Sequence, residues 1–407
     1  MTFIGEDLFH FQASLIQQGS SFEEFIKENY INKWIGDTVY AAMNVRTTMV
    51  TAVHNFLENE GLLNLERVQM SPITDPLAHD VEHVPVIHYK GMPYVTTHSM
   101  IYHKFMACFN PRFKGIFVDS PNVRLEIESP QRKQRGKYLI DFSQIDIELR
   151  RGRDIDFETY KKEPEKVKAI LKEDLEKAYD FFERMLIHAV KAIIEKNEDD
   201  LKALDVAVDV PSQPFPRLKN DEILKKYGRA GAETGAGEEA DSQFFWITGL
   251  MRENYDLIYP YIQKDGSKIP ISSFTSDMIY NYDICVKARS RSTGKYMPAL
   301  EILSGAVREW LYEPIVERLI DNKVIVERPV FKEGNITNID ILDGYGPFLA
   351  AVHMKDANGK AYFPDTFGGG LGVERLLYGL LRGSKIEKID DVTFFGKNPD
   401  SFPIFLF

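Results

Sequence analysis

The stretch FGGGLGVERLLYGLL, residues 367–381, places three consecutive glycines and a fourth at Gly372 directly before an apolar helical pattern. A glycine run costs backbone entropy, so it favours places where the backbone approaches a ligand or another segment closely. The leucines that follow recur at helical spacing and predict a packed helix. Arg375 lies at the start of that helix, where burial requires an anion such as a phosphate or a carboxylate. A structural ion pair behind a close-packed turn explains the stretch equally well.

The composition is typical of a globular protein without a membrane segment. No run of about 18 apolar residues occurs, and the N-terminus lacks the pattern of a signal peptide, so we expect a cytoplasmic protein. The net charge of −11 gives no overall attraction to nucleic acid. The basic run PQRKQRGK, residues 130–137, is predicted to be a solvated loop in preference to a nucleic-acid patch. Cys108 and Cys285 are expected to be reduced core residues and are too few for a zinc site.

The hydrophobic pattern predicts an α+β fold. Residues 1–40 are predicted to form a helical extension, and an amphipathic helix is expected over 44–60. The segment 115–152 has the pattern of two antiparallel strands joined by a basic loop. A helical insertion is predicted at about 156–227. The Gly/Ala/Glu-rich segment 228–242 is expected to be either a lid over a site or a plain flexible loop.

Three further elements are predicted between this segment and the glycine run. A helix is expected over 305–322, after strands that end near Leu303. The segments 348–355 and 360–364 are expected to be the last strands before the glycines. No internal repeat or low-complexity linker marks a boundary within the main body of the chain.

Arg124 and Glu126 stand two residues apart on the first strand of the predicted hairpin, so their side chains share a face. Phe142 is expected nearby on the second strand. An arginine, a carboxylate and an aromatic ring suit a nucleotide, because they match a phosphate, an amino group and a base. A surface strand with ordinary salt bridges is the alternative, and the hairpin alone favours it slightly.

The segment EILSGAVRE, residues 301–309, adds a second cluster of acidic and basic residues. Asp283 and Glu301 together have the chemistry to hold a Mg²⁺ ion that bridges phosphates, since such sites use one or two carboxylates. Arg308 then remains for a carboxylate of the substrate. Three motifs suited to anions in one chain point to ATP chemistry.

This combination resembles the class II aminoacyl-tRNA synthetases, specifically their aspartate/asparagine branch. Residues 46–72 are similar to the first motif of the family, 123–148 to the second and 368–377 to the third. Residues 301–309 are similar to a signature of the branch itself. The resemblance implies a catalytic domain over 41–407, with a six- or seven-stranded antiparallel sheet flanked by helices and a helical insertion after the second motif. It also implies a homodimer formed through the first motif.

The resemblance also implies how ATP is held. Arg124 would contact the α-phosphate during adenylate formation, Glu126 the adenine amino group, and Phe142 would stack on the ring. The glycines would let the strand approach ATP, and Arg375 would hold the γ-phosphate end. Arg124, Arg308 and Arg375 are the implied catalytic residues. The implied nucleotide-binding residues are Arg124, Glu126, Phe142, Gly370, Gly372 and Arg375.

At the other end of the site, Asp283 and Glu301, with Ser304, would hold Mg²⁺, and Arg308 would bind an acidic or amide side chain. Two of the positions that depart from the family pattern lie in the region expected to bind the amino acid. Met100 stands where a glutamine is expected, and His103 where the aspartate enzymes have a lysine. For His103, an ordinary helix histidine is the favoured alternative. The implied amino-acid-binding residues are Met100, His103, Ser304, Arg308 and Glu309.

The tRNA synthetases of this branch carry an anticodon-reading β-barrel before the first motif, whereas about 40 residues precede it here. The resemblance therefore implies an ATP-dependent ligase that activates aspartate or a related amino acid and passes it to ammonia or another amine without tRNA. That activity is similar to the AMP-forming asparagine synthetase. An asparagine–tRNA ligase with reduced or trans-supplied anticodon recognition and a catalytically silent regulator are the alternatives. Small molecules are the expected partners, tRNA is disfavoured, and no membrane is expected.

Overall fold

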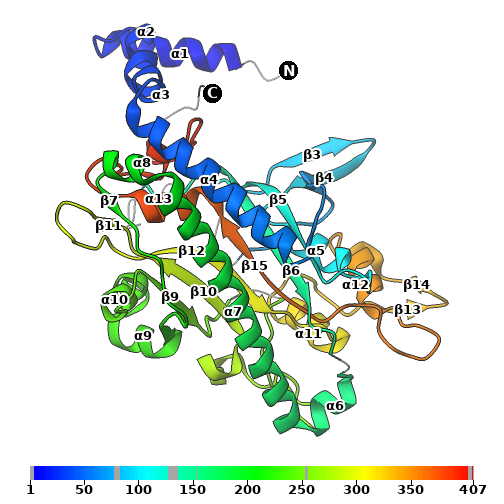
Figure 1. Cartoon of the computed structure of the whole chain (residues 1–407). Helices are drawn as coiled ribbons and strands as arrows, with labels where there is room; N and C mark the ends of the chain where they lie inside the picture. Colours follow the sequence, from blue (N-terminus) through cyan, green and yellow to red (C-terminus); the bar gives the residue numbers. More distant parts are fainter. Residues whose placement is uncertain are drawn as a thin grey trace.

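The computed structural model describes residues 4–77, 83–126, 136–153, 155–252, 255–401 and 406. A twisted central sheet crosses the molecule, and long helices pack on it (Figure 1). The sheet has eight strands in the order β1-β5-β6-β15-β12-β10-β9-β8. Its strands are β1 (Leu63–Asn64), β5 (Gly115–Val123), β6 (Asp141–Arg150), β8 (Arg217–Lys219), β9 (Phe244–Thr248), β10 (Asn281–Val286), β12 (Leu300–Val307) and β15 (Thr366–Gly372).

The six inner strands are antiparallel, which confirms the predicted fold class. The two edges differ from the prediction. Strand β1 pairs with β5 in parallel and β8 pairs with β9 in parallel, so the sheet has eight strands and is not wholly antiparallel. Both edge strands are only two or three residues long, and β8 is too short for alternation to reveal it in the sequence.

The glycines of β15 make room for side chains of the neighbouring strand β6. A Cβ at Gly368 would lie 2.2 Å from Oε2 of Glu148, and a Cβ at Gly370 would lie 2.3 Å from Nε2 of Gln144. Contacts this short are not tolerated, so any larger residue would displace these polar side chains. The main reason for these glycines is therefore that side chains of β6 occupy the space beside β15.

Successive residues of β15 face opposite sides of the sheet. A Cβ at Gly369 would meet Phe182 of helix α7 (Pro164–Lys196) at 3.3 Å, so this side is covered by α7. Helix α7 also packs against α4 (Asp37–Asn59), as Figure 1 shows. Gly370 faces the other side, because side chains alternate along a strand. The functional residues predicted for this part of the sheet lie on that second side.

The N-terminal residues are helical, and α4 ends before Gly61, whose φ of +82° suits a helix C-terminus. The division near residue 40 and the extent of the insertion at 156–227 stay predictions. The first helices are α1 (Ile4–Gln17), α2 (Phe22–Ile26), the π-helix η1 (Lys27–Ile31) and α3 (Asn32–Trp34). The later helices include α5 (Ile101–Ala107), α6 (Phe157–Lys162), α8 (Glu198–Ala203), α9 (Asn220–Tyr227), α10 (Ala232–Glu239), α11 (Tyr312–Asp321), α12 (Gly346–His353) and α13 (Val373–Leu381).

Smaller strands complete the fold. Strands β2, β4 and β3 form a separate three-stranded sheet, and two pairs of short strands lie elsewhere. Within the residues described, no helix is long and apolar enough to cross a membrane. The bounds of the small strands are β2 (Met70–Ser71), β3 (Val86–Tyr89), β4 (Met92–Thr96), β7 (Val206–Ala207), β11 (Arg289–Ser290), β13 (Phe331–Lys332) and β14 (Asn335–Ile336).

The structure corrects two local predictions and one alternative of a third. The segment 228–242 is not a plain loop, because it contains helix α10, where Lys287 Nζ donates to the carbonyl oxygens of Gly237 and Ala240 at 2.7 and 2.6 Å; its role as a lid stays a prediction. The helix predicted over 305–322 starts only at Tyr312, because β12 continues to Val307 and pairs with β15. Residues 346–353 form helix α12, where a strand was predicted.

The basic run at 130–137 lies largely outside the described residues. Only Gly136 and Lys137 of this run are described. The described residues therefore do not test whether this run is a solvated loop.

Candidate active site

A cavity of about 250 Å³ opens on the side of the sheet that α7 leaves uncovered. Residues from β6, β12 and β15 form its floor, and the start of α13, helix α5 and the segment before β10 supply its walls. Most residues predicted for the site meet here. The predicted residues that line the cavity are Arg124, Glu126, Phe142, Glu301, Ser304, Arg308, Gly370, Gly372 and Arg375.

The end of the cavity predicted for the nucleotide base holds Arg124 and Phe142. The guanidinium carbon of Arg124 lies 5.1 Å from the ring centroid of Phe142, so the cation stacks on the ring. Arg124 Nη2 also donates to the carbonyl oxygen of His98 at 2.8 Å, which fixes its direction. Glu126, two residues on, is buried and lines the same cavity. The arrangement suits adenine, and the individual roles stay predictions.

The next part of the cavity is built by oppositely charged pairs. Arg375 Nη1 lies 3.1 Å from Oε2 of Glu301, and its guanidinium stacks on the ring of Tyr138 at 5.1 Å. Lys137 Nζ lies 3.3 Å from the carboxylate of Glu233 on α10. Burial raises the pKa of Glu301, but Arg375 and other nearby cations outweigh it and leave that pKa below its ordinary value. Glu301 is therefore a carboxylate near neutral pH.

Of the three residues predicted to hold Mg²⁺, two fit directly. Glu301 and Ser304 line the cavity, whereas Asp283 lies behind the lining, with its carboxylate bound by Arg252. Asp283 nevertheless stands opposite Ser304 in the pairing of β10 with β12, so its side chain shares their face. Burial raises the pKa of Asp283, and the nearby Glu301 raises it further although Arg252 lowers it. A cation bound nearby would stabilise the charged form of Asp283 beside Glu301.

A Mg²⁺ ion that bridges phosphates needs only one or two protein carboxylates, because phosphate and water oxygens supply the other ligands. Among the described residues there is no cluster of three or more histidine, cysteine, aspartate or glutamate side chains arranged for a metal. Glu301 with Ser304 is therefore compatible with a metal shared with ATP, but not with a metal site made by the protein alone.

The other end of the cavity contains a lysine that the sequence analysis missed. Lys104 is buried, and its Nζ lies 2.9 Å from Oδ1 of Asp146 and 3.6 Å from Oε2 of Glu148. Its position on α5 aligns it with Ile101, one turn earlier, and both side chains line the cavity. Lys104 therefore stands where His103 was expected.

Met100 and His103 lie outside the cavity lining, contrary to the prediction. Met100 is buried, and its sulfur accepts a hydrogen bond from the backbone N–H of Val68 at 3.5 Å. His103 is the neighbour of Lys104 on α5, so the helix turns it by about 100° away from the lysine. Burial lowers the pKa of His103, which keeps the imidazole neutral at physiological pH.

A hydrogen-bonded group of three polar residues forms another part of the wall. Asp75 Oδ2 accepts from Ser99 Oγ at 2.7 Å and from the hydroxyl of Tyr255 at 2.9 Å. Its other oxygen accepts from the backbone N–H of Leu77 at 2.9 Å. No motif in the sequence signalled this group, because its members are 24 to 180 residues apart.

Glu309 is the third correction at the amino-acid end. Its side chain points away from the cavity and is buried, and Oε1 accepts hydrogen bonds from the backbone N–H groups of Trp310 and Leu311 at 3.1 and 3.2 Å. It stabilises the turn between β12 and α11. The neighbouring Arg308 lines the cavity because successive residues of an extended chain face opposite sides.

Glu309→Gln is expected to flatten the pH dependence of stability. Burial raises the pKa of Glu309 to about 7, well above its value in an unfolded chain. The folded state therefore binds more protons in that window, so the free energy of unfolding falls as pH rises from about 4.3 to about 7, by up to ~3 kcal/mol. Urea unfolding across this pH range should show a fall in the natural chain and a smaller fall in the variant, because burial also raises the pKa of other acids such as Asp283. Equal slopes in the two proteins would contradict this.

The central antiparallel sheet with its flanking helices is the fold of the class II synthetases. A family model described as tRNA synthetases class II (D, K and N) matches residues 22–399, and the chain belongs to this family. The resemblance drawn from the sequence motifs is confirmed at this level.

Similar proteins include aspartate and asparagine enzymes. The aspartate–tRNA(Asp) ligase of Pyrococcus furiosus is 23% identical, over 86% of this chain and 67% of its own length. The asparagine–tRNA ligase of Thermoplasma acidophilum is 26% identical over 34% of this chain and 32% of its own length. A crystal structure of asparaginyl-tRNA synthetase from Pyrococcus horikoshii complexed with asparaginyl-adenylate has a TM-score of 0.62 at 17% identity, covering 89% of this chain and 69% of that one. This last likeness concerns the fold.

Proposed function

We propose that the chain binds ATP with Mg²⁺ and converts aspartate or a closely related amino acid into its acyl-adenylate. The observation that carries this proposal is one cavity with two chemically distinct ends. Arg124, Phe142 and Arg375 line the end suited to a nucleotide. Lys104 and Arg308 line the end suited to a small polar side chain. A cavity with these two ends suits the two substrates of an adenylation reaction, a nucleotide and an amino acid.

In the proposed step, a carboxylate oxygen of the amino acid attacks the α-phosphorus of ATP. An O–P bond forms, the bond to the bridging oxygen breaks, and pyrophosphate leaves with the electron pair. Two anions must meet, so the contribution of the chain is electrostatic. Arg124 is assigned to the α-phosphate and Arg375 to the departing phosphates. When bound, Mg²⁺ supplies further positive charge to the phosphates, and Glu301 with Ser304 would hold it.

We further propose that the acyl group passes to ammonia or another small amine without tRNA. The amine nitrogen attacks the acyl carbon, a C–N bond forms and AMP leaves. The net charge of −11 supports a small acceptor, because tRNA binding depends on basic surface. Incubation with ATP, ammonium and each candidate amino acid should yield AMP and the matching amide. Detectable acylation of tRNA by the pure chain would contradict the proposal that no tRNA is used.

Asparagine–tRNA ligation is the second candidate, with anticodon recognition reduced or supplied by another protein. Membership of a tRNA synthetase family favours it. The tRNA assay above separates the two candidates, because activation of the amino acid is common to both. A catalytically silent regulator is disfavoured, since Arg124, Glu301 and Arg375 all meet in one cavity.

Lys104→Gln is expected to lower kcat/KM for the amino acid about 10- to 100-fold, because a charge-assisted hydrogen bond to the substrate is lost. The KM for ATP should change little, since Lys104 contacts Asp146, four residues along β6 from the Phe142 that Arg124 contacts. His103→Ala is the matched control on the same helix and should leave both parameters unchanged. Steady-state ATP–pyrophosphate exchange measures them. A larger effect of His103→Ala than of Lys104→Gln would contradict the assignment.

We also propose that the chain forms a homodimer through the region of the first motif, residues 46–72. Apolar side chains on the three-stranded sheet, which includes β2 of this region, are exposed, among them Met70, Ile87 and Met92. A groove of about 1130 Å³ runs beside them and contains Arg46 of α4. Sedimentation equilibrium at micromolar concentration should give twice the mass of one chain, and a monomer would contradict this.

A further inference from the structure

Arg308 is surrounded by carboxylates of its own chain. It is only 3% exposed, and its Nε lies 3.3 Å from Oε1 of Glu148. Its Nη1 lies 3.1 Å from Oδ1 of Asp256. Both acids are buried, with Glu148 0% and Asp256 1% exposed. The positive charge that was expected to bind an acidic or amide side chain is therefore balanced by two carboxylates of the protein itself.

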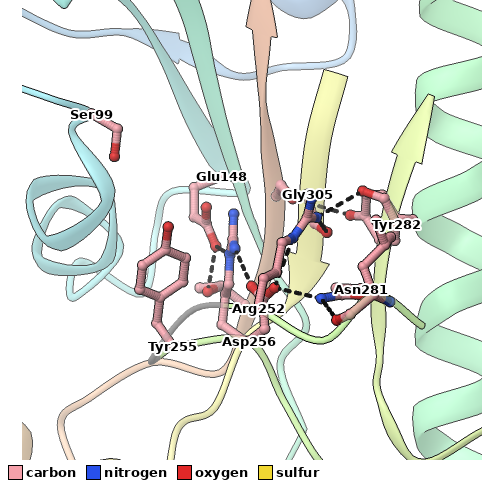
Figure 2. A network of polar contacts seen from close by, with 12 residues as sticks. Ser99, Glu148, Arg252, Tyr255, Asp256, Asn281, Tyr282 and Gly305 are labelled. Carbon is pink, nitrogen blue, oxygen red and sulfur yellow. Dashed lines mark hydrogen bonds and ion pairs between the residues drawn. The ribbon is translucent and has the colours of Figure 1, made fainter. Parts of the chain in front are cut away.

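Asp256 is held firmly in this position (Figure 2). Its Oδ2 accepts a hydrogen bond from Asn281 Nδ2 at 2.8 Å and lies 3.5 Å from Nε of Arg252. The amide of Asn281 is itself fixed by Leu250, whose backbone N–H donates to Oδ1 and whose carbonyl oxygen accepts from Nδ2, both at 2.7 Å. Because its two oxygens are bound from opposite sides, Asp256 cannot swing aside for a substrate without losing several contacts.

The charges of the neighbouring groups do not restore an excess of positive charge. Lys104 is balanced by Asp146 at 2.9 Å and also faces Glu148 at 3.6 Å. The two cations Lys104 and Arg308 are thus in contact with three carboxylates, those of Asp146, Glu148 and Asp256. Arg252 contributes one further positive charge, but it also binds Asp283, which contributes another negative one.

We propose that Asp256 is a specificity-determining residue, which makes this end of the cavity select an uncharged hydrogen-bonding side chain, such as a carboxamide, over a carboxylate. This inference rests on the proposed amino-acid activation. A carboxamide oxygen accepts hydrogen bonds from Arg308 or Lys104, and its NH₂ group donates to Oδ1 of Asp256, which retains a second lone pair. A carboxylate has no proton to donate and would become a third anion around Arg308.

L-Asparagine and L-aspartate have nearly the same shape, so ATP–pyrophosphate exchange with each tests the charge alone. The natural chain should use asparagine with a kcat/KM at least about tenfold above that for aspartate. Asp256→Asn removes the charge and keeps the shape, and should move this ratio toward aspartate by at least about tenfold. Glu183→Gln is the matched control, because Glu183 is a buried acid bound to Trp246 Nε1 outside the cavity. It should leave the ratio unchanged.

A second measurement on the natural chain avoids any effect of Asp256→Asn on folding. Calorimetry with the two non-hydrolysable sulfamoyl adenosine analogues should show the asparaginyl analogue binding at least about tenfold more tightly than the aspartyl one. Equal or tighter binding of the aspartyl analogue, or an aspartate preference that Asp256→Asn does not change, would overturn the role of Asp256 while leaving amino-acid activation intact. Failure of both analogues to bind, with no exchange for any amino acid, would overturn the proposed function as well.

Discussion

Replacing Arg375 with alanine should lower the rate of amino-acid-dependent ATP–pyrophosphate exchange by about 10²- to 10³-fold, the usual cost of removing one charge-stabilising donor. The guanidinium lies in the first turn of α13, 3.1 Å from Glu301 and stacked on Tyr138. Alanine removes the positive charge assigned to the departing phosphates. Exchange kinetics at saturating amino acid measure the effect directly.

The matched control for this substitution is Arg328→Ala. Arg328 forms an exposed ion pair with Glu317 at 2.8 Å, away from the cavity. Exposed pairs of this kind are worth less than about 1 kcal/mol, so fold and activity should be retained. Exchange by the Arg375→Ala variant within a few-fold of the natural chain would contradict the assignment of the third motif to ATP.

Arg308→Met should destabilise the folded chain by about 3–5 kcal/mol, because one cation of a buried charge network is removed. Glu148 and Asp256 would then each lose a partner at 3.3 and 3.1 Å while staying buried. Methionine has a similar length and fills the space, so the loss comes from uncompensated charge rather than from a cavity. Urea unfolding followed by tryptophan fluorescence measures it.

Arg328→Met is the control for this stability measurement, since it replaces an exposed arginine of the same length. It should cost less than about 1 kcal/mol. If Arg308→Met were as mild as the control, the buried network around Arg308 would not be the source of stability that its geometry indicates. In that case, adding Asp256→Asn to the Arg308→Met variant should restore little free energy of unfolding.

The glycine run shows what the sequence establishes and where it stops. The pattern predicts a glycine strand entering a helix with an arginine in its first turn, and the structure has β15 followed by α13 with Arg375. The reason for the glycines is only partly the predicted one. Gly370 and Gly372 do line the cavity, but the space at Gly368 and Gly370 is taken by side chains of β6. Packing between two strands whose contacting residues, such as Glu148 and Thr366, are 218 positions apart is not visible in a local pattern.

Lys104 and Asp256 escaped prediction for different physical reasons. On a helix, one residue changes the facing direction by about 100°, so the choice between His103 and Lys104 depends on where the helix starts, which is the least certain feature of a pattern. Asp256 reaches Arg308 because the two residues are partners in an isolated antiparallel bridge. Their contact is set by the course of the chain before β10, where the sequence has no motif.

The errors in secondary structure have a related cause. The run over 348–355 is apolar without a clear period, so a strand was predicted where α12 forms. Around 305–307 the helical pattern of α11 extends backwards into residues that pair with β15 instead. In both places tertiary contacts decide between two local conformations of similar propensity.

The central claim is that the chain activates an amino acid with ATP, and amino-acid-dependent ATP–pyrophosphate exchange without tRNA tests it most directly. Assayed across a panel of amino acids with Mg²⁺, the chain should exchange pyrophosphate with asparagine or aspartate and with few others, and omission of Mg²⁺ should abolish the signal. Exchange with no amino acid, by a chain shown to be folded, would contradict the claim.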